Sequence, residues 1–118
     1  MSGWVGVDLD GTIAHYDGWK GPAEIGAPIP LMVERVRAWL AAGRDVRIFT
    51  ARISGLDHAQ TLQAYEAIEA WCLEHLGQVL PITNVKDLTM VELYDDRCVA
   101  VEQNTGRLLS DPQPRFTP

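Results

Sequence analysis

The sequence predicts an α/β fold with a mainly parallel sheet of about five strands, in a single domain over residues 1–118. Short apolar stretches alternate with longer ones whose apolar residues recur at helical spacing, the pattern of strand, helix, strand units. A length of 118 residues is close to the commonest domain size. A hydrophobic content of 47% and a charged content of 22% are those of a globular protein with its own core.

The overall charge and the cysteines exclude several classes of protein. A net charge of −6 makes tight nucleic-acid binding unexpected, since that binding depends on Lys and Arg. Cys72 and Cys98 stand apart from each other and form no zinc or redox motif. The chain opens without a signal-peptide pattern and holds no apolar run long enough to cross a bilayer. We therefore expect a cytoplasmic protein that does not bind membranes, of unknown oligomeric state.

Residues 4–12 are an apolar run that ends abruptly at Asp8, Asp10, Gly11 and Thr12. They predict a buried strand whose carboxyl end carries acids, which is where open α/β sheets bind ligands. If the strand continues, Asp8 and Asp10 point to the same face. Two carboxylates about 5 Å apart repel by roughly 3 kcal/mol at an effective dielectric constant near 20. We therefore expect a Mg2+ ion between them, or a raised pKa on one of them.

Residues 13–30 hold three glycines and three prolines, a composition that prevents regular structure. They predict an irregular loop after the first strand. Two interpretations fit its polar and aromatic side chains. They either face a substrate or belong to an aromatic loop that only covers the edge of the sheet; the residues in question are His15, Tyr16, Asp17, Trp19 and Lys20.

A helix is predicted over residues 31–42, where the apolar residues fall on one helical face. Pro30 near its start and Gly43 just past its end are typical helix boundaries. Residues 45–49 then predict a second strand, which ends at Thr50. Together these elements form the strand, helix, strand unit of a parallel sheet.

A second, longer helix is predicted to run to about residue 76, with its apolar stripe packed in the core. Asp57 is the expected N-cap, Gln60 completes a loose capping box, and Gly77 ends the helix. Residues 79–82 predict a third strand, which Pro81 confines to an edge or a strand end.

Residues 91–94 predict a fourth strand, followed by Asp95 and Asp96, and residues 98–101 a fifth. Only eight residues, 83–90, link the third and fourth strands, which is short for a parallel crossover. Either a helix of one or two turns lies there, or the strand assignment is wrong. Residues 110–118 are expected to form a loose tail because they are rich in proline.

Polar side chains stand at or just beyond the ends of four predicted strands: Asp8 with Asp10, Thr50, Lys86, and Asp95 with Asp96. In a parallel sheet these ends meet at one edge. Each residue alone is weak evidence, because a threonine at a strand end is usually structural and Lys86 beside Asp87 resembles a surface ion pair. Their order and placement together indicate one site.

The string Asp-Leu-Asp-Gly-Thr at residues 8–12 resembles the first motif of the haloacid dehalogenase-like (HAD) phosphatases and phosphotransferases. The set of polar residues matches the four HAD motifs in order, over residues 5–97. The resemblance implies a small member with a three-layer Rossmann-like fold. It also implies that the loop at residues 13–30 is a flap beside the active site. We expect no cap domain, since residues 13–49 and 51–85 are filled by the flap and by predicted core elements.

The resemblance also implies roles for single residues. Asp8 would be the nucleophile, and Asp10 the general acid and base, with its main-chain carbonyl at Mg2+. Thr50 would hydrogen-bond the transferring phosphoryl group, and Lys86 would neutralise its charge and hold Asp8. Asp96 is the first choice for the remaining metal ligand, with Asp95 supporting it.

Four further residues beside these motifs are candidates for substrate binding: Gly11, Thr12, Ala51 and Arg52. Arg52, together with Lys20 and His58, has a competing interpretation as a solvated surface charge.

The function that the resemblance implies is Mg2+-dependent hydrolysis of a phosphomonoester through an aspartyl-phosphate on Asp8. A receiver-like signalling domain has a similar acidic site, but there the adjacent acids come early, whereas Asp95 and Asp96 come last. A non-catalytic HAD-like module that binds a partner is the third possibility. The sequence leaves open the class of phosphorylated substrate, an acceptor besides water, and a lid supplied by a partner.

Overall fold

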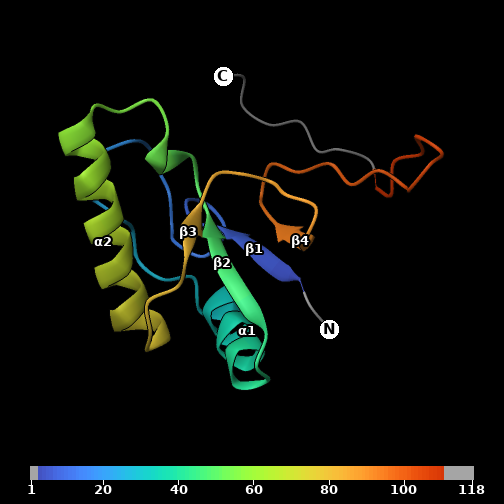
Figure 1. Cartoon of the computed structure of the whole chain (residues 1–118), viewed down its shortest axis with the longest axis horizontal. Coiled ribbons are helices and arrows are strands. Elements are labelled where there is room, and N and C mark those ends of the chain that lie inside the picture. The colour runs from blue at the N-terminus through green and yellow to red at the C-terminus, as the bar shows by residue number, and fades with distance from the viewer. Residues whose placement is uncertain (1–2, 111–118) are drawn as a thin grey trace.

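The computed structural model describes residues 3–110, which form an α/β structure with an all-parallel sheet. Within this range the sheet has four strands in the order β3-β2-β1-β4 (Figure 1). They are β1 (Trp4–Asp8), β2 (Asp45–Phe49), β3 (Ile82–Thr83) and β4 (Met90–Tyr94). The helices are α1 (Pro30–Ala41) and α2 (His58–Leu76), with a short 3-10 turn, η1 (Ala51–Ile53), after β2.

The predicted boundaries agree with the observed helices to within one or two residues. The side chain of Asp57 accepts a hydrogen bond from the backbone N–H of Gln60 at 2.8 Å, the predicted cap of α2. Gly77 ends α2 in the left-handed conformation, at φ 83°. The third strand starts later than predicted, after Pro81, whose carbonyl accepts from the N–H of Ile48.

The prediction of a fifth strand at residues 98–101 was wrong. This segment belongs to an arm that extends away from the sheet after β4 (Figure 1). The arm pairs with itself, because the N–H of Glu102 donates to the carbonyl of Arg107 and Val101 forms a single antiparallel bridge with Leu108. The turn at residues 103–105 thus gives Val101 a local partner in place of the sheet. Most of the predicted loose tail, residues 111–118, lies outside the described residues.

The short link between the third and fourth strands has a different explanation from either that we expected. β3 and β4 lie on opposite edges of the sheet, and residues 84–89 connect them without a helix. This link contacts the start of β1, because Trp4 donates from its indole N–H to Asp87 at 2.9 Å and from its backbone N–H to Thr89. Among the described residues, a coil segment therefore lies where the predicted three-layer fold would place a helix.

The core lies between the sheet and the two helices. Val5 and Val7 of β1 belong to the same buried cluster as Val36 of α1 and Ile68 of α2. Trp4 is also buried but is not part of this cluster, as expected for a residue that alternates to the opposite face of the strand. This packing fixes β1 at the centre of the sheet. None of the helices among residues 3–110 is long and apolar enough to span a membrane.

The flap between β1 and α1 is held to the body by its backbone. The N–H of His15 donates to the carbonyl of Ala27 at 2.8 Å, and the indole N–H of Trp71 on α2 donates to the carbonyl of Gly26 at 2.9 Å. A Cβ atom on Gly26 would lie 1.9 Å from the carbonyl oxygen of His15. Only glycine fits this close approach of two backbone segments.

The substitution Gly26→Ala should therefore force the two flap segments apart. We expect a loss of about 2 to 3 kcal/mol in the free energy of unfolding, measured by urea denaturation. Ala23→Ser, at an exposed position of the same flap, should change that free energy by less than about 0.5 kcal/mol. Equal stabilities for the two variants would show that the flap is not packed as described.

Candidate functional site

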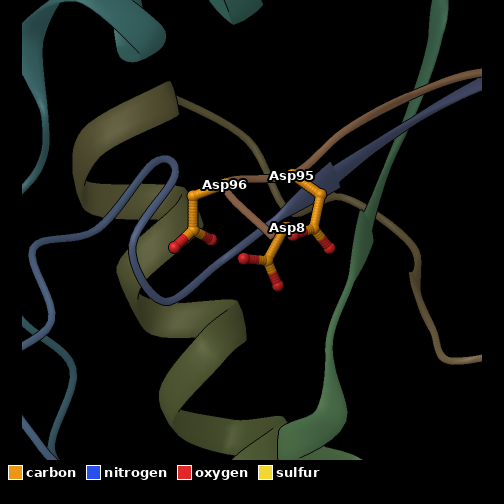
Figure 2. Close-up of side chains that lie close together, drawn as sticks. All are labelled: Asp8, Asp95 and Asp96. Carbon is orange, nitrogen blue, oxygen red and sulfur yellow. The ribbon is translucent and has the colours of Figure 1, made fainter. Parts of the chain in front are cut away.

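Three carboxylates gather at the carboxyl ends of β1 and β4. One oxygen from each of Asp8, Asp95 and Asp96 lies within 4.8 Å of the others. Figure 2 shows the three side chains close together, Asp8 at the end of β1 and the other two on the turn after β4. The cluster follows from the sheet, since β1 pairs in parallel with β4 and Val7 lies opposite Tyr94. The residues that follow these two are Asp8 and Asp95.

Thr12 joins the two sides of the cluster. Its hydroxyl lies 3.3 Å from a carboxylate oxygen of Asp8 and 3.2 Å from one of Asp96, and it accepts from the N–H of Asp96 at 3.0 Å. The chain can turn back toward Asp96 here because Gly11 has φ 89°. A Cβ atom on Gly11 would lie 2.7 Å from a carboxylate oxygen of Asp96. Gly11 and Thr12 therefore shape the acidic cluster.

The cluster raises the pKa of Asp8 to about 8. Burial of the carboxyl is the main cause, followed by the negative charge of Asp95 and by a hydrogen bond and charge from Asp96; the hydrogen bond from Thr12 acts in the opposite direction. Burial and the neighbouring acids together would thus keep a proton on Asp8 at neutral pH. A cation bound among the three acids would remove that need.

The residues of the cluster fit a hard divalent cation such as Mg2+. The three ligands are carboxylate oxygens, which Mg2+ prefers, and they are close enough to share one ion. Asp8, Asp95 and Asp96 are the residues that would hold it. The carboxylate of Asp10 is not a member of this group.

Asp10 is instead paired with Arg52. The guanidinium donates to both carboxylate oxygens, at 2.7 and 2.9 Å, in a bidentate ion pair. β1 ends at Asp8 and the chain turns at Leu9, so the two acids do not continue along one strand face. The negative charge of Asp10 is thus neutralised by Arg52 and not by a cation shared with Asp8.

Arg52 also ties the flap to the site. Its guanidinium donates to the carbonyl of Glu24 at 2.7 Å and to that of Gly21 at 3.3 Å. It lies 5.0 Å from the centre of the Trp19 ring, within range of a cation–π interaction. The Arg52 side chain is only 4% exposed, so the interpretation of Arg52 as a solvated surface charge was wrong.

The three clustered acids, Asp10 and Arg52 line a cavity of about 520 Å3. Its lining includes acidic groups, the 3-10 turn after β2, and aromatic side chains of the flap and of β2. The lining residues are Asp8, Asp10, Gly11, Tyr16, Trp19, Phe49, Thr50, Ala51, Arg52, Ser54, Leu56, Asp95, Asp96 and Arg97.

Most of the predicted site residues meet at this cavity, with Thr12 bonded to its acidic wall. Thr50 is buried, and its hydroxyl accepts from the backbone N–H of Arg52 at 3.1 Å. Lys86 is exposed and does not line the cavity. It lies near Cys98, where its positive charge lowers the pKa of a thiol that burial and the acids raise. Lys20 is exposed and pairs with Asp17 at 3.0 Å.

Sequence reasoning missed three features of the site. Phe49 was assigned only to a strand, yet it lines the cavity, as does Leu56 from the turn after η1. The partner of Asp10 was not foreseen, although Arg52 directly follows the site residues Thr50 and Ala51. The φ > 0 conformation required of Gly11 was signalled by its place after two acids in a turn.

Comparison of the chain with protein-family models, with curated proteins and with solved structures gave no match. The resemblance to the HAD family therefore depends on the motif residues themselves.

The raised pKa of Asp8 should make the metal-free protein less stable as the pH rises. Unfolding returns Asp8 to its ordinary pKa of 3.8, so the folded chain binds more protons between about pH 4 and pH 8. Stability from this group is full below about pH 4 and is lost as the pH rises through about 8. Asp8→Asn should remove that loss and be more stable than the wild type at pH 8 in EDTA, by about 1 to 2 kcal/mol given partial solvent screening.

Thermal denaturation in EDTA at pH 5 and pH 8 measures this difference. Mg2+ should restore stability to the wild type at pH 8 and have little effect on Asp8→Asn. Identical pH profiles for the two proteins would contradict the proton held at Asp8.

Arg52 and Asp10 should be strongly coupled in stability. Arg52→Met leaves the partly buried Asp10 carboxylate without its partner and should lower the free energy of unfolding by about 3 kcal/mol. In a double-mutant cycle with Asp10→Asn, we expect a coupling energy above about 1 kcal/mol. The exposed pair Arg47 and Asp45, also bidentate in its hydrogen bonds, is the matched control and should couple less strongly. Equal coupling energies in the two cycles would show that the pair of Arg52 and Asp10 contributes no more to stability than an exposed ion pair.

Proposed function

We propose that this chain is a Mg2+-dependent phosphomonoester hydrolase of the HAD type, with Asp8 as its nucleophile. One observation carries the proposal: the acids of the first and last predicted motifs, Asp8 with Asp95 and Asp96, lie within 4.8 Å of one another beside a cavity. Asp10 and Thr50 of the first and second motifs line the same cavity. A Rossmann-like layout without a cap domain belongs to the same proposal.

Mg2+ held by Asp8, Asp95 and Asp96 would supply positive charge that offsets the charge of the phosphoryl oxygens and of the nucleophile. It would also keep Asp8 ionised at neutral pH, since a bound cation opposes the effects that raise its pKa. Asp8 is then a carboxylate able to attack phosphorus.

In the first step, a carboxylate oxygen of Asp8 forms a bond to phosphorus, and the bond from phosphorus to the leaving oxygen breaks. The electron pair stays on the leaving oxygen, which takes a proton from Asp10. The product is an aspartyl-phosphate on Asp8 and a free alcohol. The hydroxyl oxygen of Thr50 accepts from the backbone N–H of Arg52, so the hydroxyl proton of Thr50 is able to donate to a phosphoryl oxygen.

In the second step, Asp10 takes a proton from a water molecule whose oxygen bonds to phosphorus, and the bond to Asp8 breaks. Inorganic phosphate leaves and Asp8 is regenerated. Both oxygens of Asp10 accept from Arg52, so each step requires Asp10 to free one oxygen from the guanidinium. Lys86 would have to turn toward Asp8 to neutralise the phosphoryl group, a motion open to an exposed lysine.

A receiver-like domain would keep its phosphate on Asp8 and transmit a signal. The position of Asp10 beside the same cavity supports turnover, because a general base close to an aspartyl-phosphate favours its hydrolysis. A non-catalytic module would have no need for the full set of acids. We also propose a cytoplasmic location, which the free thiols Cys72 and Cys98 support.

Asp8→Asn should abolish phosphatase activity while the fold is kept. We expect release of inorganic phosphate from phosphomonoesters to fall by at least about 1000-fold, since the nucleophile is lost. The wild type should need Mg2+, and EDTA should stop it reversibly. Asp45→Asn, the same change at the exposed start of β2, is the matched control and should keep full activity. Near wild-type turnover in Asp8→Asn would contradict the assignment of Asp8 as the nucleophile.

A further inference from the structure

We infer that the substrate is a phosphomonoester whose leaving group carries a planar aromatic ring, as a nucleoside 5′-monophosphate does. The inference rests on the proposed phosphatase function and adds the class of substrate to it. It is carried by the lining of the cavity, in which the Trp19 ring lies beside Arg52, the partner of Asp10.

The cavity is much larger than a phosphoryl group requires. Its volume of about 520 Å3 falls in the range of roughly 300 to 1,000 Å3 that is typical of sites for small organic ligands. A phosphoryl group bound at Asp8 therefore leaves most of the space to the rest of the substrate. The remaining walls decide which substrates fit.

Those walls carry flat apolar surface that the protein itself leaves uncovered. Trp19 and Tyr16 of the flap line the cavity and are 49% and 39% exposed. Phe49 and Leu56 line it as well. Exposed aromatic surface inside a cavity is a binding surface for a ligand with an apolar face.

The aromatic wall is linked to the leaving-group side of the reaction through Arg52. Asp10 would protonate the leaving oxygen, so the leaving group lies next to Asp10. Arg52 binds Asp10 on one side and lies 5.0 Å from the centre of the Trp19 ring. The leaving group thus emerges beside Trp19, whose ring Arg52 helps to hold in place.

Several polar side chains of this part of the wall already make hydrogen bonds within the protein. Ser54 accepts a hydrogen bond from Asn84, and Thr50 accepts from the backbone of Arg52. The guanidinium of Arg52 donates to Asp10 and to two flap carbonyls. A leaving group recognised by hydrogen bonds alone needs several free donors and acceptors, whereas an aromatic ring needs only a flat surface. This favours the aromatic class.

A matched pair of substrates tests the inference. Adenosine 5′-monophosphate and ribose 5-phosphate have the same primary leaving oxygen and the same ribose unit, and differ in the aromatic base. With Mg2+, we expect the wild type to hydrolyse the nucleotide with a kcat/KM at least about 10-fold higher, the effect of stacking one base. Trp19→Ala should bring the two values within about 2-fold by lowering the value for the nucleotide.

Trp19→Phe keeps a ring at the same position and should retain most of the preference. This variant keeps the test decisive if Trp19→Ala fails to fold. Equal kcat/KM values in the wild type, or equal losses on both substrates in Trp19→Ala, would overturn the aromatic class while the phosphatase function stands. If the wild type released phosphate from neither substrate nor from any other phosphomonoester, the proposed function itself would fail, and the inference with it.

Discussion

The repulsion among three carboxylates at one edge of the sheet is the constraint on which the rest of this structure depends. The parallel pairing of β1 with β4 brings Asp8 next to Asp95 and Asp96, and burial raises the free energy of keeping all three ionised. The sheet can hold such a cluster because the core beneath Val5 and Val7 fixes β1 at its centre. Positive charge would therefore stabilise the cluster, and the proposed phosphoryl transfer needs positive charge at this place.

The second acid of the first motif is treated differently from Asp8. Asp10 is paired with Arg52, and the same guanidinium donates to two flap carbonyls. One residue thus connects the acid and base of the proposed reaction to the loop that would cover a substrate. Two carboxylates only two positions apart thus have separate environments, because their neighbours differ.

Local sequence patterns predicted the elements but not all of their partners. Caps and periodicity were enough for α1 and α2, and the acids after β1 and β4 indicated the cluster. Val99 and Val101 have the composition of a strand, but the nearby turn pairs their segment with itself. The pairing of Arg52 with Asp10 joins residues far apart in the chain, and Lys86 lies outside the cavity despite its position after the third strand. Such long-range geometry follows from packing, which local spacing does not encode.

The covalent intermediate gives the most direct test of the proposed chemistry. A phosphomonoester should be mixed with the protein and Mg2+, the reaction stopped with acid after successive times, and the peptides mapped by mass spectrometry. The proposed mechanism predicts a phosphoryl group on Asp8 that appears within the first turnover and disappears as phosphate is released. A phosphoryl group on another residue, a stable one on Asp8, or phosphate release without any labelled peptide would contradict it.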